Sequence, residues 1–396
     1  MKTKFLIPAL LFCTVMISAE TIELKVTNSN NTRINNAPVV VVLDKYKNIP
    51  VHERAALAVF VDGKQISSQL DDLNTDGIPD ELVFLINLQR KQTRTVTLKT
   101  IPSAQRDSFP TEVYADMITK EKKGPKVFVR KASSTKNDMY NTMYHHGVAF
   151  ESALIAYRIY FDNKSTVDVY GKKKQQLELA TTGWYPTDAQ LAAGYGDDIL
   201  QVFSLVGVGS VKGWDGTKAT HIDKFDKRTQ RIVSTGKLRT VVESDVEGWQ
   251  YEGKKINMTV RYIMYARHRD VVAEVRASED IAFLATGVQQ TGGGPLFSNK
   301  QGLVGSWGTY YPVTDTIKYA KQTVGLGVCV PTVSVLKHVT DGANNLILMS
   351  YHKGDILRFY LTAVSRKEEN TPYTSDKAFF AYLRQWENEL KPVTVK

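Results

Sequence analysis

The sequence has 396 residues, of which 42% are hydrophobic, and a formal net charge of +10. This length allows two domains with sizeable apolar cores, and the basic surplus favours anionic partners through long-range attraction. There is no Lys/Arg stripe on a predicted helix, no zinc-finger spacing and no RNA-binding signature, which argues against a nucleic-acid partner. An acidic sugar, or a surface charged only for solubility, fits the composition better.

The first residues predict a secretory signal peptide. Lys2 and Lys4 precede an apolar run over residues 5–17, and small residues follow it up to Ala19. The run is too short to span a bilayer comfortably. We therefore expect a signal peptide at 1–19 and a secreted, periplasmic product with no membrane anchor.

Short strands follow. Residues 22–26 alternate between apolar and polar types, residues 39–43 form a β-branched run, and Asp62-Gly63 is a hairpin-turn dipeptide. Roughly five or six such strands are enough for a small sandwich. Residues 20–110 are therefore predicted to form an immunoglobulin-like β-sandwich.

The segment 72–80 resembles the first part of a calcium-binding loop. Oxygen-bearing side chains occupy relative positions 1, 3, 5 and 9, and glycine occupies position 6. Val83 stands where the usual glutamate would be, and the loop leads into a strand. The pattern predicts a structural calcium ion, with an acidic turn without metal as the alternative; no cofactor is expected for the chemistry. The predicted ligands are Asp72, Asn74, Asp76 and Asp80.

The rest of the chain, residues 111–396, keeps a β texture of long alternating strands separated by Gly, Asp and Asn turns. No βαβ rhythm is present, so a large antiparallel β-supersandwich is predicted and the whole protein is expected to be all-β. One C-terminal helix is predicted after a cap at Ser375 or Thr374. Its apolar face is expected to comprise Phe379, Phe380, Leu383, Trp386 and Leu390.

A dense group of polar and aromatic residues begins at His145 and His146. Consecutive residues of a strand project to opposite sides, so at most one histidine should face a given cleft. Histidine suits proton transfer near neutral pH, although a surface or hydrogen-bonded histidine is the simpler interpretation. Further candidates on the next predicted strands are Glu151, Arg158, Tyr160, Tyr170 and Lys172.

Two aromatic loops and one charged run complete the candidates. Trp184 and Tyr185 lie in Gly-Trp-Tyr-Pro, and Trp214 lies in Gly-Trp-Asp-Gly. Aromatic rings suit the C–H faces of sugars while neighbouring carboxylates bind hydroxyls, but the same residues could fill a core or form turns. His268 and Arg269 belong to a charged run at the end of a strand, which could equally be a solvated turn.

Several of these motifs occur in the order found in a known family. They are Asp-Glu-Leu-Val-Phe-Leu (80–85), Met-Tyr-His-His-Gly-Val-Ala-Phe-Glu-Ser (143–152), Ala-Tyr-Arg-Ile-Tyr-Phe-Asp (156–162), Asp-Val-Tyr-Gly-Lys-Lys (168–173) and Gly-Asp-Asp-Ile-Leu (196–200). The sequence resembles secreted proteins of bacterial polysaccharide-utilisation loci, a domain-of-unknown-function family that includes the ulvan oligosaccharide dehydratase. The resemblance covers nearly the whole mature chain. It implies a galactose-mutarotase-like supersandwich and removal of water from a non-reducing-end uronic acid, which gives a 4,5-unsaturated product.

Such an elimination needs a base, a clamp that neutralises the carboxylate, and an acid for the departing hydroxyl. We assign His146, or else His145, as the base. The clamp is Arg158 or Arg239, because a guanidinium matches a carboxylate with two hydrogen bonds, and the acid is Tyr160 or Tyr170. The predicted substrate-binding residues are Glu151, Lys172, Trp184, Tyr185, Trp214, His268 and Arg269. A non-catalytic carbohydrate-binding protein and a sugar mutarotase or epimerase remain as alternatives.

Overall fold

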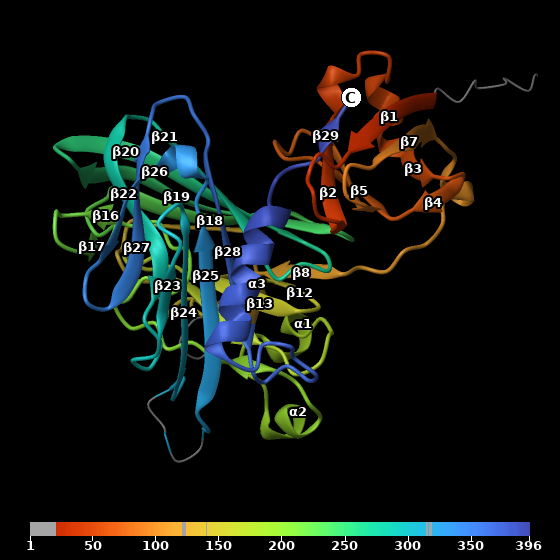
Figure 1. Cartoon of the computed structure of the whole chain (residues 1–396). Helices are drawn as coiled ribbons and strands as arrows, with labels where there is room; N and C mark the ends of the chain where they lie inside the picture. Colours follow the sequence, from red (N-terminus) through yellow and green to blue (C-terminus); the bar gives the residue numbers. More distant parts are fainter. Residues whose placement is uncertain (1–20, 121–123, 140, 314–315, 317–318) are drawn as a thin grey trace, which may run out of the picture.

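The computed structural model describes residues 21–120, 124–139, 141–313, 316 and 319–396. The predicted signal peptide lies outside these residues. The described chain is mostly antiparallel β-strand and has one long helix near its C-terminal end, so the all-β prediction is confirmed (Figure 1). Within the described ranges, no helix is both long enough and apolar enough to cross a membrane.

Two sheets near the N-terminus form a small sandwich. Its core comes from alternating residues of both sheets, such as Leu24 and Val26 facing Val39 and Val41. One sheet has the order β29 (Thr394–Val395), β1 (Thr21–Thr27), β7 (Thr93–Thr100), β3 (Leu57–Val61) and β4 (Lys64–Ile66). The other has the order β2 (Ile34–Val42), β6 (Glu81–Leu88) and β5 (Ser68–Asp71).

The C-terminal strand β29 belongs to this small sandwich. Val26 of β1 pairs with Val395, and Val393 and Val395 pack against the small core. The sequence prediction had placed all of residues 111–396 in the second domain. The chain end instead returns to the first sandwich, because its two apolar residues complete that core.

A nine-stranded antiparallel sheet is the centre of the larger part. Its order is β11 (Lys131–Ser134), β18 (Lys227–Thr235), β19 (Arg239–Tyr251), β20 (Lys254–Tyr265), β21 (Val271–Ala277), β28 (Leu357–Ser365), β25 (Gln322–Cys329), β24 (Leu303–Tyr310) and β23 (Leu296–Ser298). Long β-branched runs such as those in β19 and β20 favour extended backbone.

Two smaller sheets cover the inner face of the nine-stranded sheet, and apolar residues of all three form one core. The five-stranded sheet has the order β15 (Asp197–Asp198), β14 (Val167–Gly171), β13 (Ile155–Tyr160), β12 (Gly147–Ser152) and β8 (Val113–Asp116). The three-stranded sheet has the order β22 (Ile281–Gln289), β27 (Asn344–Tyr351) and β26 (Val335–Thr340). The remaining elements are β9 (Ile118–Lys120), β10 (Lys126–Phe128), β16 (Gly213–Trp214), β17 (Ala219–Thr220), α1 (Leu179–Thr182), α2 (Asp188–Ala192) and the 3₁₀ turns η1 (Leu43–Lys45), η2 (Val51–Ala56), η3 (Ser103–Gln105) and η4 (Thr332–Ser334).

Helix α3 (Asp376–Glu389) packs on the outer face of β24 and β25 (Figure 1). The hydroxyl of Ser375 accepts a hydrogen bond from the Ala378 amide, 3.2 Å away, and so caps the helix. The predicted apolar face is confirmed, because Phe379, Phe380, Leu383, Trp386 and Leu390 all lie in the cluster between helix and sheet. Gly325 makes room for the helix, since a Cβ there would lie 2.8 Å from Phe379.

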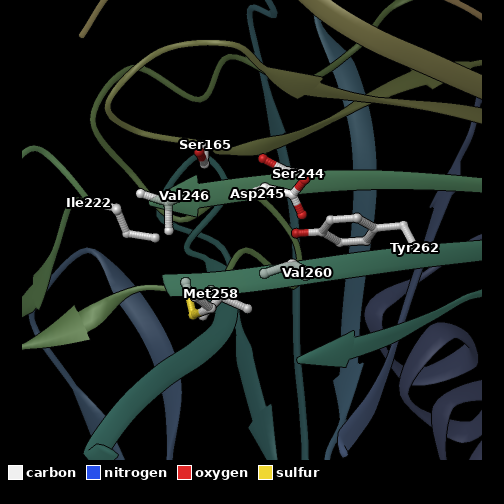
Figure 2. A pocket seen from close by; sticks show the side chains of 9 residues that line it. Ser165, Ile222, Ser244, Asp245, Val246, Met258, Val260 and Tyr262 are labelled. Atoms are coloured by element: carbon white, nitrogen blue, oxygen red, sulfur yellow. The ribbon is translucent and has the colours of Figure 1, made fainter. Parts of the chain in front are cut away.

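Two cavities lie beside the nine-stranded sheet. A small one of about 10 Å³ sits at its inner face among Ser165, Ser244, Asp245 and Tyr262 (Figure 2). A cavity of this size holds at most one water. A larger one of about 340 Å³ separates β2 of the small sandwich from the outer face of the large sheet and the end of α3.

Candidate functional site

The candidate site lies on the outer face of the five-stranded sheet. Along β13, Tyr157 and Ile159 point into the core, so Arg158 between them points to the opposite face. Register places Arg158 directly opposite Asp168 on β14 and opposite the small Ala149 on β12. Strict alternation therefore brings a row of polar groups onto the face that the core does not use.

Arg158 is the centre of this site. Its Nε and Nη2 atoms donate to Oδ2 of Asp168 at 2.9 and 2.6 Å, and Nη2 also donates to Asp198 at 2.8 Å. Nη2 lies 2.8 Å from the hydroxyl of Tyr160. Arg158 is only 3% exposed, so these bonds are made out of water, where charge-assisted pairs are strong. We call Arg158, Tyr160, Asp168 and Asp198 the Arg158 cluster.

The cluster contains a carboxyl group that can hold a proton near neutral pH. Tyr160 donates its hydroxyl to Asp168 Oδ2 at 2.9 Å. Burial and the nearby Asp198 raise the pKa of Asp168 to about 7, although Arg158 acts in the opposite direction. Burial and Asp168 also raise the pKa of Tyr160, which keeps its hydroxyl protonated. Tyr160 and Asp168 thus form a short path for a proton.

His146 stands beside this path. Its ring stacks on the ring of Tyr160 with centroids 6.0 Å apart, and it meets the ring of Tyr185 edge to face at 6.1 Å. The backbone of His146 is left-handed, with φ of 71°, and so is that of Trp184, with φ of 76°. Such conformations are unfavourable for residues with a Cβ and concentrate at functional sites. The structure therefore brings His146, Arg158, Tyr160 and Tyr185 together, as the sequence analysis expected of one site.

Aromatic and basic side chains form the rim of the site. Tyr185 is 39% exposed and its hydroxyl accepts a hydrogen bond from Arg158 Nη1 at 3.0 Å. Tyr144 packs edge to face against Tyr185, and the ammonium of Lys126 lies 3.5 Å above the Tyr144 ring. Lys164 lies in the turn between β13 and β14, and its ammonium is 5.2 Å from the centroid of the Tyr160 ring. An anionic, partly flat ligand would meet both rings and cations here.

Trp184 differs from its prediction. It is fully buried, so it cannot stack on a sugar as expected from the sequence. Its ring instead covers the guanidinium of Arg158 at 4.4 Å, and its Nε1 donates to Asp198 at 3.1 Å. Trp184 therefore holds the cluster in place from above, and Tyr185 is the exposed ring of the pair.

His145 is also buried, whereas His146 is partly open. The ring nitrogen Nε2 of His145 lies 2.7 Å from Asp116 Oδ1, and its Nδ1 has no hydrogen-bond partner among the described residues. Asp116 occupies the same row of the sheet as Ala149 and Arg158. As the alternation rule indicated, only one of the two histidines reaches the open side, which makes His146 the better candidate for the base.

Tyr170, Glu151 and Lys172 form a separate, buried network next to the cluster. The ammonium of Lys172 contacts the carboxylate of Glu151, which also accepts the amides of Glu178 and Leu179 at the start of α1 at 2.9 Å. The hydroxyl of Tyr170 donates to Glu178 at 2.8 Å. Burial raises the pKa of Glu151 and lowers that of Lys172. These residues hold α1 on the sheet, so the structure does not support substrate contact by them or an acid role for Tyr170.

Arg239 lies elsewhere. Its Nε and Nη2 donate to Asp71 and its Nη2 to Glu81, at 2.5 to 2.8 Å, which links the large sheet to the small sandwich. Its guanidinium is buried in that contact, beside an apolar cluster that includes Val83 and Val241. Arg239 therefore joins the two parts of the structure, and its occupied donors do not support a role as a substrate clamp.

His268 and Arg269 are also remote from the cluster. His268 lines the larger cavity, where Nδ1 lies 3.1 Å from Asp270 and Nε2 lies 2.9 Å from the carbonyl of Asn36 in β2. Burial disfavours its protonated form, but Asp270 outweighs burial and raises the pKa of His268. Arg269 pairs with Glu368 at 3.1 Å. Both side chains link neighbouring segments of the chain, so the structure does not support the substrate contact that was predicted for them.

Trp214 belongs to the short hairpin of β16 and β17, at the left of Figure 1 and away from α1. Its amide and carbonyl both bond to the hydroxyl of Tyr251, at 2.7 and 3.0 Å. It therefore takes no part in the site around Arg158.

The predicted calcium loop folds around its own carboxylates. Asp72 accepts the amides of Thr75 and Gly77 at 2.7 and 2.8 Å, and Asp80 accepts the amide of Leu73 at 2.6 Å. These bonds form a compact turn whose side chains are the oxygen ligands that calcium takes. Over the described ranges, no three His, Cys, Asp or Glu side chains converge as a metal site would require. Calcium stays a prediction for this loop.

The residues that sequence reasoning missed are mainly acidic. Asp168 and Asp198 occur inside the motifs at 168–173 and 196–200, and Asp116 belongs to none of the motifs. Asp168 alternates with the apolar Val167 and Val169 of a buried strand, and a charged residue in that position signals a partner on the same face. That signal could have pointed to Asp168, but not to the identity of its partner.

Comparison with known proteins places the chain in a family. Residues 26–395 match the family model described as "Domain of unknown function (DUF4861)". The chain belongs to the DUF4861 family. No curated protein matches it significantly.

Among solved structures, this DUF4861 protein is similar to a glycosyl hydrolase family 38 protein from Enterococcus faecalis, with 9% identity and a TM-score of 0.42 over 94% of this chain and 47% of that one. It is similar to an alpha-mannosidase from Enterococcus faecalis V583 as well, with 9% identity and a TM-score of 0.43 over 95% of this chain and 46% of that one. This chain thus spans about half the length of both.

Proposed function

We propose that this DUF4861 protein is an oligosaccharide dehydratase that removes water from a uronic acid at the non-reducing end. One observation carries the proposal: the partly open His146 ring stacks on Tyr160, whose hydroxyl bonds to Asp168 with a raised pKa. A base and a proton donor therefore border one aromatic ring. Elimination of water needs that combination.

The reaction would use the two groups in sequence. His146 takes the proton from C5 of the uronate, and the electron pair forms the C4–C5 double bond. The bond from C4 to its hydroxyl breaks, and that hydroxyl takes a proton from Tyr160 and leaves as water. For this step the Tyr160 hydroxyl turns its proton from Asp168 to the leaving hydroxyl, and the protonated form of Asp168 then gives its proton to the tyrosinate oxygen 2.9 Å away. General acid and base steps of this kind each contribute about 10²–10⁴-fold to the rate.

Arg158 has a different role from the one expected. Its donors already bind Asp168, Asp198, Tyr160 and Tyr185, so it does not offer an open fork to a substrate carboxylate. It keeps the two carboxylates and the tyrosine hydroxyl at fixed positions. Fixed charges and dipoles reduce the reorganisation that a reaction requires.

The test is to incubate the purified protein with uronate-ended oligosaccharides and to follow the ultraviolet absorbance of the conjugated double bond. We expect the absorbance to rise with wild type. With His146→Asn or Tyr160→Phe, the rate of this rise should be lower by about 10²-fold or more. Asparagine tolerates the left-handed backbone at position 146. The exposed His52 provides a control, because His52→Asn should leave the rate unchanged.

The same assay distinguishes the alternatives. A changed anomer or epimer ratio without new absorbance would indicate a mutarotase or epimerase. Saturable binding without any conversion would indicate a carbohydrate-binding protein. Either result would contradict the dehydratase proposal.

A further inference from the structure

The proposed reaction leaves one requirement unmet, the neutralisation of the substrate carboxylate. As the C5 proton leaves, a second negative charge develops on that group, so a cation must lie close to it. Arg158 is already shared between Asp168 and Asp198. Because its donors already bind Asp168, Asp198, Tyr160 and Tyr185, Arg158 offers no pair of open donors to a substrate carboxylate. Another cation has to serve.

Lys164 is a cation close to the proposed proton donor. Its ammonium is 5.2 Å from the ring centroid of Tyr160, and the ring of His146 is 6.0 Å from the same centroid. Its side chain is 26% exposed, so solvent and ligands can reach it. Lys164 and His146 thus both lie next to the ring of Tyr160.

The turn that carries Lys164 is held firmly. The amide of Lys164 donates to Asp162 Oδ1 at 2.8 Å, and the buried Lys212 donates to the carbonyl of Lys164. Arg228, which is also buried, donates to the hydroxyl of Ser165 at 2.5 Å. Burial lowers the pKa of Lys212 to about 7, and a lysine is buried at such a cost only where it makes specific bonds. The backbone at Lys164 is thus fixed from both sides.

The ammonium of Lys164 itself is held less tightly than its backbone. It lies 3.2 Å from Asp162 Oδ2. A partly exposed pair of this kind contributes little to stability and exchanges partners easily. We propose that Lys164 binds the carboxylate of the terminal uronate and stabilises the charge that develops on it during elimination. This inference rests on the proposed dehydratase function.

The test compares Lys164→Met, Lys164→Arg and wild type on a uronate-ended oligosaccharide and on its uronate methyl ester. Lys164→Met should lower kcat/KM on the free acid by about 10²–10³-fold, as loss of one charge-stabilising donor does elsewhere. The loss on the ester should be less than about tenfold, because the ester has no charge to neutralise. Lys164→Arg should recover part of the rate. Lys255→Met removes a more exposed lysine, whose ammonium lies 3.1 Å from Asp226, and should behave as wild type.

Calorimetric binding of the acid and the ester to the same variants separates this inference from the function itself. If no variant, wild type included, forms product, the dehydratase proposal fails, but selective loss of acid binding in Lys164→Met would still support the carboxylate contact. Equal losses on acid and ester, or unchanged kcat/KM and binding in Lys164→Met, would overturn the inference. The inference would also be overturned if Lys126→Met, and not Lys164→Met, lowered kcat/KM on the free acid.

Discussion

Replacing Arg158 with Met tests the electrostatic organisation of the site. Methionine keeps much of the apolar stem but leaves Asp168 and Asp198 facing each other without their cation. Breaking a buried ion pair from one side costs about 3–5 kcal/mol, and Arg158 serves two carboxylates, so the upper part of this range applies. For domains of this size each kcal/mol lowers Tm by about 2–4 °C, so we expect a drop on the order of 10 °C.

The stability loss caused by Arg158→Met should also depend on pH in a direction that can be predicted. Arg158 holds the folded-state pKa of Asp168 down, so without it that pKa rises further and the folded protein binds more protons than the unfolded chain. The stability of the variant then decreases as pH rises from about 5 to about 7. The loss of unfolding free energy in Arg158→Met relative to wild type should therefore be larger at about pH 7 than at about pH 5. Differential scanning calorimetry at both pH values measures it. Arg94→Met, which breaks a surface pair with Asp62, should cost less than about 1 kcal/mol. A deficit below that level for Arg158→Met, or one equal at both pH values, would refute the reasoning.

Two further predictions concern the proton path and the loop. Wild type is expected to lose activity as pH rises through about 7, because Asp168 gives up its proton there. Asp168→Asn should lower kcat and should no longer show this loss. A variant that keeps the wild-type pH profile would exclude Asp168 from the proton path. Calcium added to chelator-treated protein should raise Tm, and the double variant Asp72→Asn, Asp76→Asn should abolish the rise; an unchanged Tm in wild type would leave the acidic turn without metal as the correct interpretation.

Much of the fold followed from local patterns. Alternation and turn residues predicted the strands, and the apolar face from Phe379 to Leu390 predicted the packing of α3. The return of Val393 and Val395 to the first sandwich could not be read locally, because the pairing of β29 with β1 joins the two ends of the described chain. Long-range strand pairing depends on tertiary packing, which short windows of sequence do not contain.

The candidate site also shows which features local sequence predicts and which depend on long-range contacts. Residue type and proximity in sequence were enough to select His146, Arg158, Tyr160 and Tyr185, which the structure places close together. They could not separate Arg158 from Arg239, because the partners of each are set by cross-strand register and by contact with the other sandwich. Asp71, which binds Arg239, is 168 positions away in the sequence.

The central claim is that His146 and Tyr160 act together to remove water from a uronate. Mass spectrometry of a uronate-ended oligosaccharide after incubation with wild type and with His146→Asn tests it most directly. The account predicts a product lighter by one water, unsaturated at its non-reducing end, that wild type forms and His146→Asn forms at a greatly reduced rate. An oligosaccharide of unchanged mass after incubation with wild type, or equal conversion by both proteins, would contradict it.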